Sequence, residues 1–155
     1  MNAKEIKELI EQQKAALFSG SLAAIRNADT GEPVPMVDEN DDQTHWFIPL
    51  IDNGQVMGFA IANFAGKVVI NGLLAPNAEE KLDPSFFLQP LPAMLSEIKA
   101  AYPQYKIASQ SFSYDEIPQR WAWRIILENK DQQVTLFAGA TGWYEKRERR
   151  QGWEG

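Results

Sequence analysis

Apolar side chains near the start of the chain recur at the spacing of an amphipathic helix. Over residues 2–18, Ile6, Ile10 and Leu17 share one face, while charged and amide side chains occupy most of the remaining surface. Such a stripe predicts a helix that packs along one side against a core. The helix is expected to end at Ser19-Gly20, because the apolar pattern stops there.

From residue 46 onward, the apolar positions recur with a period of two, which predicts β-strands. The turn formers Asp52-Asn53-Gly54 interrupt this pattern and predict a tight hairpin. One face of the return strand carries small side chains, at Val56, Gly58, Ala60 and Ala62. A helix can lie close to such a face. A third strand is expected over 67–70, which completes a three-stranded meander.

Two stretches lack a clear period. Glycine, proline and acidic residues dominate residues 29–42 and predict a mobile surface loop. Residues 71–90 contain several prolines and are expected to connect two halves of the chain, with a helical turn near 77–81. A second helix is predicted to begin near Pro92, where proline suits the first turn, and to stop at Pro103.

The last third of the chain alternates again with a period of two. Strands are predicted over 106–114, 120–128 and 133–144, with a hairpin turn at 129–132 and a bend or bulge at 139–142. On the middle strand, Trp121 and Trp123 share a face with Ile125 and Leu127, so core packing is expected there.

The predicted order is helix, three strands, helix, three strands. This order indicates an α+β fold of two helix-plus-three-strand antiparallel units, with the helices packed on curved sheet. A length of 155 residues suits one domain over 1–155. Within it, halves of about 1–75 and 76–145 are expected to be similar, followed by a flexible C-terminal tail over 146–155.

Composition removes several classes of function. The absence of cysteine excludes disulfides, thiolate metal ligands and cysteine nucleophiles. A formal net charge of −6 argues against a nucleic-acid partner, and no apolar run approaches the roughly 20 residues of a membrane span. The N-terminus lacks the features of a secretory signal, so the chain is expected to be cytoplasmic if Met1 is the native start.

Candidate catalytic chemistry is sparse. His45 is the sole histidine, so a metal site with several histidines is excluded and a serine triad would need this residue. The acidic run 38–42 alternates oxygen ligands, but Gln43 and Pro49 stand where an EF-hand requires Gly and Glu. We therefore expect no catalytic residue, no metal site and no cofactor, and we interpret the run as a solvated loop.

The second half resembles the PepSY domain, a small module of one helix and three strands. The likeness covers about residues 91–145 and rests on the break at Tyr102-Pro103, the strand from Tyr105, the charged turn Asp115-Glu116, the aromatic strand Trp121–Leu127 and the ending Thr141-Gly142. Ala138 and Trp143-Tyr144 depart from the usual ending of such modules. The first half is similar, at Ile48-Pro49-Leu50 and 66–70, to cystatin-like propeptides. The resemblance implies a non-catalytic binding or regulatory module that acts on peptidases.

A binding face is expected on the second predicted sheet. The candidate binding residues are Arg124, Ile126, Phe137, Trp143 and Tyr144. Arg124 and Ile126 project from the face opposite Trp121, and they would form a mixed apolar and cationic patch if that face is uncovered. Patches of this composition are enriched at protein interfaces. The first hypothesis is therefore a module that contacts a protein or peptide through an open sheet face or an edge strand.

Two other functions stay open. A small-ligand carrier or small enzyme would hold its ligand in a pocket beneath the helices, lined by His45 or an acidic residue. A homodimeric structural protein would join sheet to sheet through the many aromatic side chains.

Overall fold

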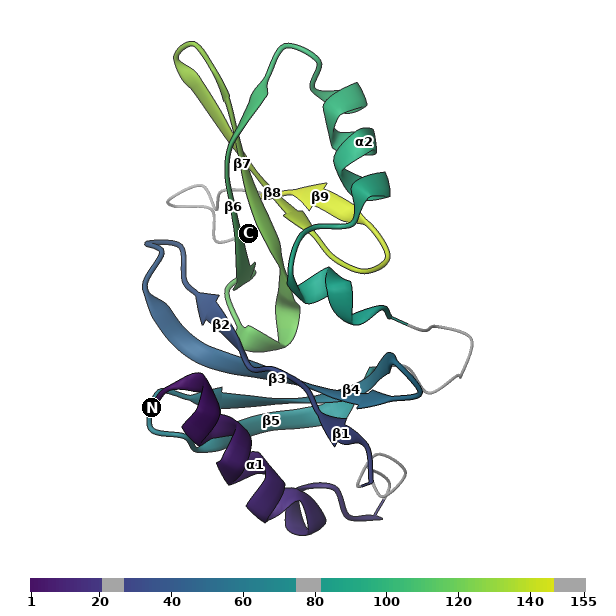
Figure 1. Cartoon of the computed structure of the whole chain (residues 1–155). Helices are drawn as coiled ribbons and strands as arrows, with labels where there is room; N and C mark the ends of the chain where they lie inside the picture. Colours follow the sequence, from purple (N-terminus) through teal and green to yellow (C-terminus); the bar gives the residue numbers. More distant parts are fainter. Residues whose placement is uncertain (21–26, 75–81, 147–155) are drawn as a thin grey trace, which may run out of the picture.

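The computed structural model describes residues 1–20, 27–74 and 82–146. These residues form two α-helices, two short 3-10 helices and two antiparallel sheets (Figure 1). The α+β class predicted from the sequence is confirmed. The predicted helical turn at 77–81 and, apart from Lys146, the predicted flexible tail lie outside the described residues. In the part of the chain that the structure describes, no helix is long and apolar enough to cross a membrane.

The first sheet consists of β1 (Asp29–Thr30), β2 (Val34–Val37), β3 (Gln43–Asp52), β4 (Gln55–Asn63) and β5 (Val68–Leu73). Both β1 and β2 pair antiparallel with β3, which then pairs with β4 and β4 with β5. The prediction of a mobile loop over 29–42 is therefore wrong for residues 29–30 and 34–37. Met36 is fully buried and pairs with His45 of β3. Burial of this side chain in the core stabilises β2 as a strand, although the composition of the segment favours turns.

The first helix, α1 (Ala3–Leu17), confirms the N-terminal prediction. Asn2 caps it, because its side-chain oxygen accepts a hydrogen bond of 2.9 Å from the Glu5 amide. Ile6 and Ile10 are fully buried and belong to one apolar cluster with Ala60 and Ala62 of β4. The small side chains of β4 do lie close under a helix, as the alternation predicts.

The β3–β4 hairpin also matches its prediction. Asn53 and Gly54 both have positive φ, 51° and 75°, which is the backbone of the type I′ turns that favour Asn-Gly. One correction concerns Val56. Leu50 pairs with Gly58 whereas Ile51 pairs with Val56, so a bulge interrupts the alternation. Val56 consequently belongs to the larger core cluster and not to the cluster beneath α1.

The second sheet contains β6 (Lys106–Tyr114), β7 (Trp121–Asn129), β8 (Gln132–Ala138) and β9 (Trp143–Glu145), in that order. The helix α2 (Pro92–Ala101) precedes it, and the 3-10 helices η2 (Pro84–Phe87) and η3 (Pro118–Arg120) lie before α2 and β7. The single last strand predicted over 133–144 is wrong. The Gly139 amide donates to the Gly142 carbonyl at 2.9 Å, and the chain reverses there into a hairpin instead of a bend or bulge.

One apolar core joins the two sheets. Phe47 of β3 lies at its centre, with ring centroids 4.8 Å from Phe87 and 5.5 Å from Phe112. Trp123 of β7 is also buried there, and its indole N–H donates to the Phe86 carbonyl at 2.6 Å. Ile98 of α2 completes this cluster from the helix side. The sheets therefore share side chains from both halves of the sequence.

Candidate functional site

The expected open face of the second sheet is covered around Arg124 and Phe137. Arg124 is only 3% exposed and Phe137 only 1%, while Ile126 is half-buried. The Arg124 guanidinium donates through Nη1 to the Asp38 carbonyl, and through Nη2 to the Asp41 carboxylate. Both partners belong to the loop between β2 and β3. Arg124 lies on the face opposite Trp121, and at Arg124 that face is not open to a partner.

The β2–β3 loop is shaped to accept Arg124. The Asp38 carboxylate accepts hydrogen bonds from the amides of Asn40 at 2.8 Å and Asp42 at 3.1 Å, which closes a tight turn. Asp41 has a φ of 63°, a left-handed conformation that aspartate tolerates better than most residues. Arg124 thereby links the first sheet to the second. We assign it a structural role in place of the expected binding role.

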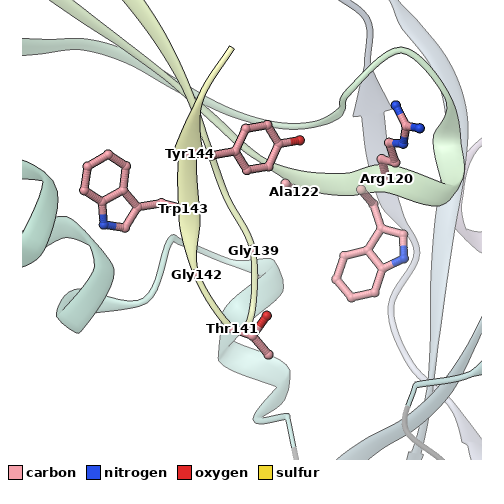
Figure 2. A pocket seen from close by; sticks show the side chains of 8 residues that line it. Arg120, Ala122, Gly139, Thr141, Gly142, Trp143 and Tyr144 are labelled. Carbon is pink, nitrogen blue, oxygen red and sulfur yellow. The ribbon is translucent and has the colours of Figure 1, made fainter. Parts of the chain in front are cut away.

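Trp143 and Tyr144 lie on opposite sides of β9 (Figure 2), as strand geometry requires. Trp143 is half-buried against α2, and its indole N–H donates to Glu97 at 3.1 Å. Tyr144 is 47% exposed, and its hydroxyl donates to Asp115 at 2.6 Å. Partial burial, followed by the hydrogen bond to Asp115, raises the pKa of Tyr144 to about 12. Of the five predicted binding residues, Tyr144 is the one that is substantially exposed.

Tyr144 borders a recess at the end of the second sheet, which we call the notch. Its lining consists of Arg120, Trp121, Ala122, Gly139, Thr141, Gly142, Trp143 and Tyr144, around a volume of about 410 Å³. The notch exists because β8 is shorter than β7. The β7–β8 pairing begins at Trp123 and Ala138, so Trp121 and Ala122 pair with β6 alone. Figure 2 shows Tyr144 reaching across this gap toward Ala122 and Arg120.

The notch combines aromatic surface with hydrogen-bond donors. Trp121 and Thr141 donate no side-chain hydrogen bond within the described part of the chain, and Arg120 forms a long, exposed ion pair of 3.9 Å with Glu116. Gly139 and Gly142 add no side chains to the lining. Of the lining residues, sequence reasoning predicted Trp143 and Tyr144 as binding residues and missed the others, which are Arg120, Trp121, Ala122, Thr141 and both glycines. The signal available was glycine inside a predicted strand, which marks close approach of a ligand or another backbone.

His45 does not line the notch. Its ring packs edge-on against Tyr114 at 5.8 Å, and Nδ1 lies 2.8 Å from the Thr44 hydroxyl. Burial lowers the pKa of His45 below its ordinary value of 6.5. Among the described residues, no group of three or more histidine, aspartate or glutamate side chains is placed to hold a metal ion.

The lowered pKa of His45 predicts a pH dependence of stability. Because the folded state binds the imidazole proton more weakly than the unfolded state, the contribution of His45 to the free energy of unfolding is fully present above about pH 6.5 and is lost as the pH drops below it. Urea unfolding between about pH 7 and pH 5 measures this loss, since ordinary carboxyl groups titrate mainly below that window. His45→Gln should flatten the profile. An unchanged slope in this variant would assign the loss to another group.

No family model, curated protein or solved structure matches this chain.

Proposed function

We propose that the protein is a non-catalytic binding module that holds an extended peptide segment of a partner protein in the notch. The observation that carries this proposal is the end of β8 at Ala138, which leaves Trp121 and Ala122 of β7 without a strand on one side. The resulting recess lies between β7 and β9. It is open to solvent at the exposed side chain of Tyr144. An extended peptide suits such a gap, because peptides commonly bind by adding a strand to the exposed edge of a sheet.

The lining chemistry favours a peptide over a free ion. The exposed ring of Tyr144 offers flat apolar surface to aliphatic or proline side chains, whereas the ring of Trp121 packs mainly in the core against Phe47 and Phe87. Donors on Arg120, Trp121 and Thr141 suit the carbonyl oxygens of a peptide backbone. Proline-rich segments present such carbonyls with few N–H groups, and they bind in aromatic-lined grooves. A proline-rich or aliphatic segment is therefore the occupant that we favour.

The family resemblance points the same way. Thr141 and Gly142, two of the residues that carry the likeness to the PepSY domain, line the notch. The finer arrangement of PepSY-like and cystatin-like units remains part of this proposal. Under it, the partner is a protein of the peptidase class, as the resemblance implies, and the notch is the point of contact.

The test fills the notch with a side chain. Gly142 has no positive φ, and a Cβ placed on it has no atom within 4 Å, so Gly142→Trp adds bulk without backbone strain. We expect this variant to weaken binding of dye-labelled proline-rich or aliphatic peptides at least about tenfold, because each 1.4 kcal/mol of lost contact is a factor of ten. Fluorescence anisotropy measures the affinities, and the thermal midpoint should stay within a few degrees.

The matched control is Gln133→Trp, which adds the same side chain at an exposed position on β8 away from the notch. Peptide affinity should be unchanged in this control. Equal weakening in both variants would mean that the added tryptophan acts nonspecifically. Binding that survives Gly142→Trp, or no binding by any peptide of an array that includes charged sequences, would exclude the notch as a peptide site.

A further inference from the structure

A second recess lies at the other end of the second sheet, between the C-terminal end of α2 and the start of β6. We call it the α2 cleft. Its lining consists of Ile98, Lys99, Tyr102, Pro103, Tyr105, Lys106, Ile107 and Leu127, around a volume of about 440 Å³. This volume falls in the range of about 300 to 1,000 Å³ that is typical of small-ligand pockets. None of these residues lines the notch.

The interior of the α2 cleft is apolar. Ile98 and Leu127 form part of its lining and also belong to the main core, where their exposures are 0% and 2%. The rings of Tyr102 and Tyr105 pack edge to face with centroids 5.6 Å apart. Their hydroxyls donate to Glu145 and Gln132 at the ends of neighbouring strands. The polar atoms of both tyrosines therefore already have partners outside the lining, and the rings supply carbon surface.

Two cations complete the lining. Lys99 and Lys106 are exposed, and neither forms an ion pair within the part of the chain that the structure describes. The basic residues that do form ion pairs there are Lys7, Lys14, Arg120, Arg124 and Lys146. In a chain with a net charge of −6, two unpaired ammonium groups beside one apolar cleft form a local positive site.

Nearby charges favour the positions of Lys99 and Lys106 only in part, and they do not compensate the positive charge of either ammonium group. Lys99 lies in the last turn of α2. The helix dipole favours a cation there, but the negative charge at the helix end is only a fraction of a unit charge. Lys106 has Glu128 as its cross-strand neighbour, yet the two side chains make no ion pair. Neither lysine is thus neutralised by a full opposing charge. An anion bound in the α2 cleft would be attracted by both ammonium groups.

We propose that the α2 cleft binds a small amphipathic carboxylate. The apolar body, an unbranched alkyl chain or an aromatic ring, lies against the half-buried side chains of Tyr102, Tyr105 and Ile107, and the carboxylate is held by Lys99 and Lys106. Burial of the body supplies about 25 cal/mol for each Å² of apolar surface removed from water. The two ammonium groups select the anion over uncharged molecules of the same shape.

Octanoate is the probe, and octanamide and octylamine are its uncharged and cationic counterparts. Isothermal titration calorimetry on the full chain should detect octanoate binding, with octanamide at least about tenfold weaker and octylamine undetectable. In the double variant Lys99→Gln/Lys106→Gln, octanoate should bind as weakly as octanamide while octanamide affinity is unchanged. Glu128→Gln should tighten octanoate binding, because it removes the one carboxylate opposite Lys106.

The matched control is Lys67→Gln/Lys130→Gln, which removes two exposed lysines elsewhere and keeps the same net charge as the test variant. Octanoate affinity should be unaffected in this control. Equal affinity for octanoate and octanamide, unchanged octanoate binding in the test variant, or no binding of octanoate would each overturn the proposal. These variants leave the notch intact, so the peptide proposal stands or falls independently.

Discussion

Phe47→Ala is expected to lower the free energy of unfolding by about 3–5 kcal/mol, the usual cost of deleting a buried aromatic ring. Phe47 is fully buried on β3, and its ring lies 5.4 Å from Phe59 of the first sheet and 4.9 Å from Trp121 of the second. The cavity left by the ring would therefore lie between the two sheets. Partial collapse of the neighbours cannot fill it without moving one sheet toward the other.

Chemical denaturation of Phe47→Ala, Phe47→Leu and Phe64→Ala tests this expectation. Phe47→Leu keeps most of the volume and should lose about half as much stability or less. Phe64 is 52% exposed, so Phe64→Ala should change stability by no more than about 0.5 kcal/mol. A loss in Phe47→Ala as small as that in Phe64→Ala would show that the two sheets do not depend on a shared core.

Elements specified by neighbouring residues were predictable from the sequence. The helix α1 follows from its apolar stripe and its Asn2 cap, and the β3–β4 hairpin follows from Asn53-Gly54. In both cases, the residues that determine the element lie within a few positions of one another. Local propensity and side-chain period then agree with the final structure, and tertiary contacts only reinforce them.

Elements held by distant partners were not predictable in the same way. β1 and β2 contain turn-forming residues, but both pair with β3, where Thr30 of β1 is buried and Met36 of β2 enters the core between the sheets. The division of the last predicted strand depends on a turn at Gly139–Gly142, which puts Trp143 on the face of Ala138, where a continuous strand would put Tyr144. Because Trp143 and Tyr144 are both aromatic, a period of two in the apolar positions does not reveal this change of face.

The candidate site shows the same limit. The side of the sheet on which Arg124 projects follows from alternation, because its neighbours Trp123 and Ile125 belong to the core. The burial of Arg124 does not follow from alternation, because the loop that covers Arg124 precedes it by more than 80 residues in the sequence. Tyr144 was predicted as a binding residue and lines the notch. The notch itself arises from unequal strand lengths, which become visible only after the register of β7 and β8 is known.

The burial of Arg124 makes Asp41 a stabilising residue despite its exposed position. Asp41→Ala is expected to lower the free energy of unfolding by about 2–3 kcal/mol, because it leaves a nearly buried guanidinium without its carboxylate. For a domain of this size, that loss corresponds to a fall of about 5–10 °C in the thermal midpoint. Glu39→Ala in the same loop breaks an exposed ion pair of 3.4 Å with Lys146 and should cost no more than about 0.5 kcal/mol.

A double-mutant cycle separates the cost of an unpaired charge from the loss of a contact. Arg124→Met removes the charge and keeps apolar bulk, so the double variant Asp41→Ala/Arg124→Met should be more stable than the sum of the single changes predicts, by about 1–2 kcal/mol. This coupling should persist in high salt, because Arg124 is shielded from solvent, whereas the effect of Glu39→Ala should shrink. Additive losses would mean that Asp41 does not compensate the buried charge, and that the backbone carbonyl of Asp38 alone holds Arg124 in place.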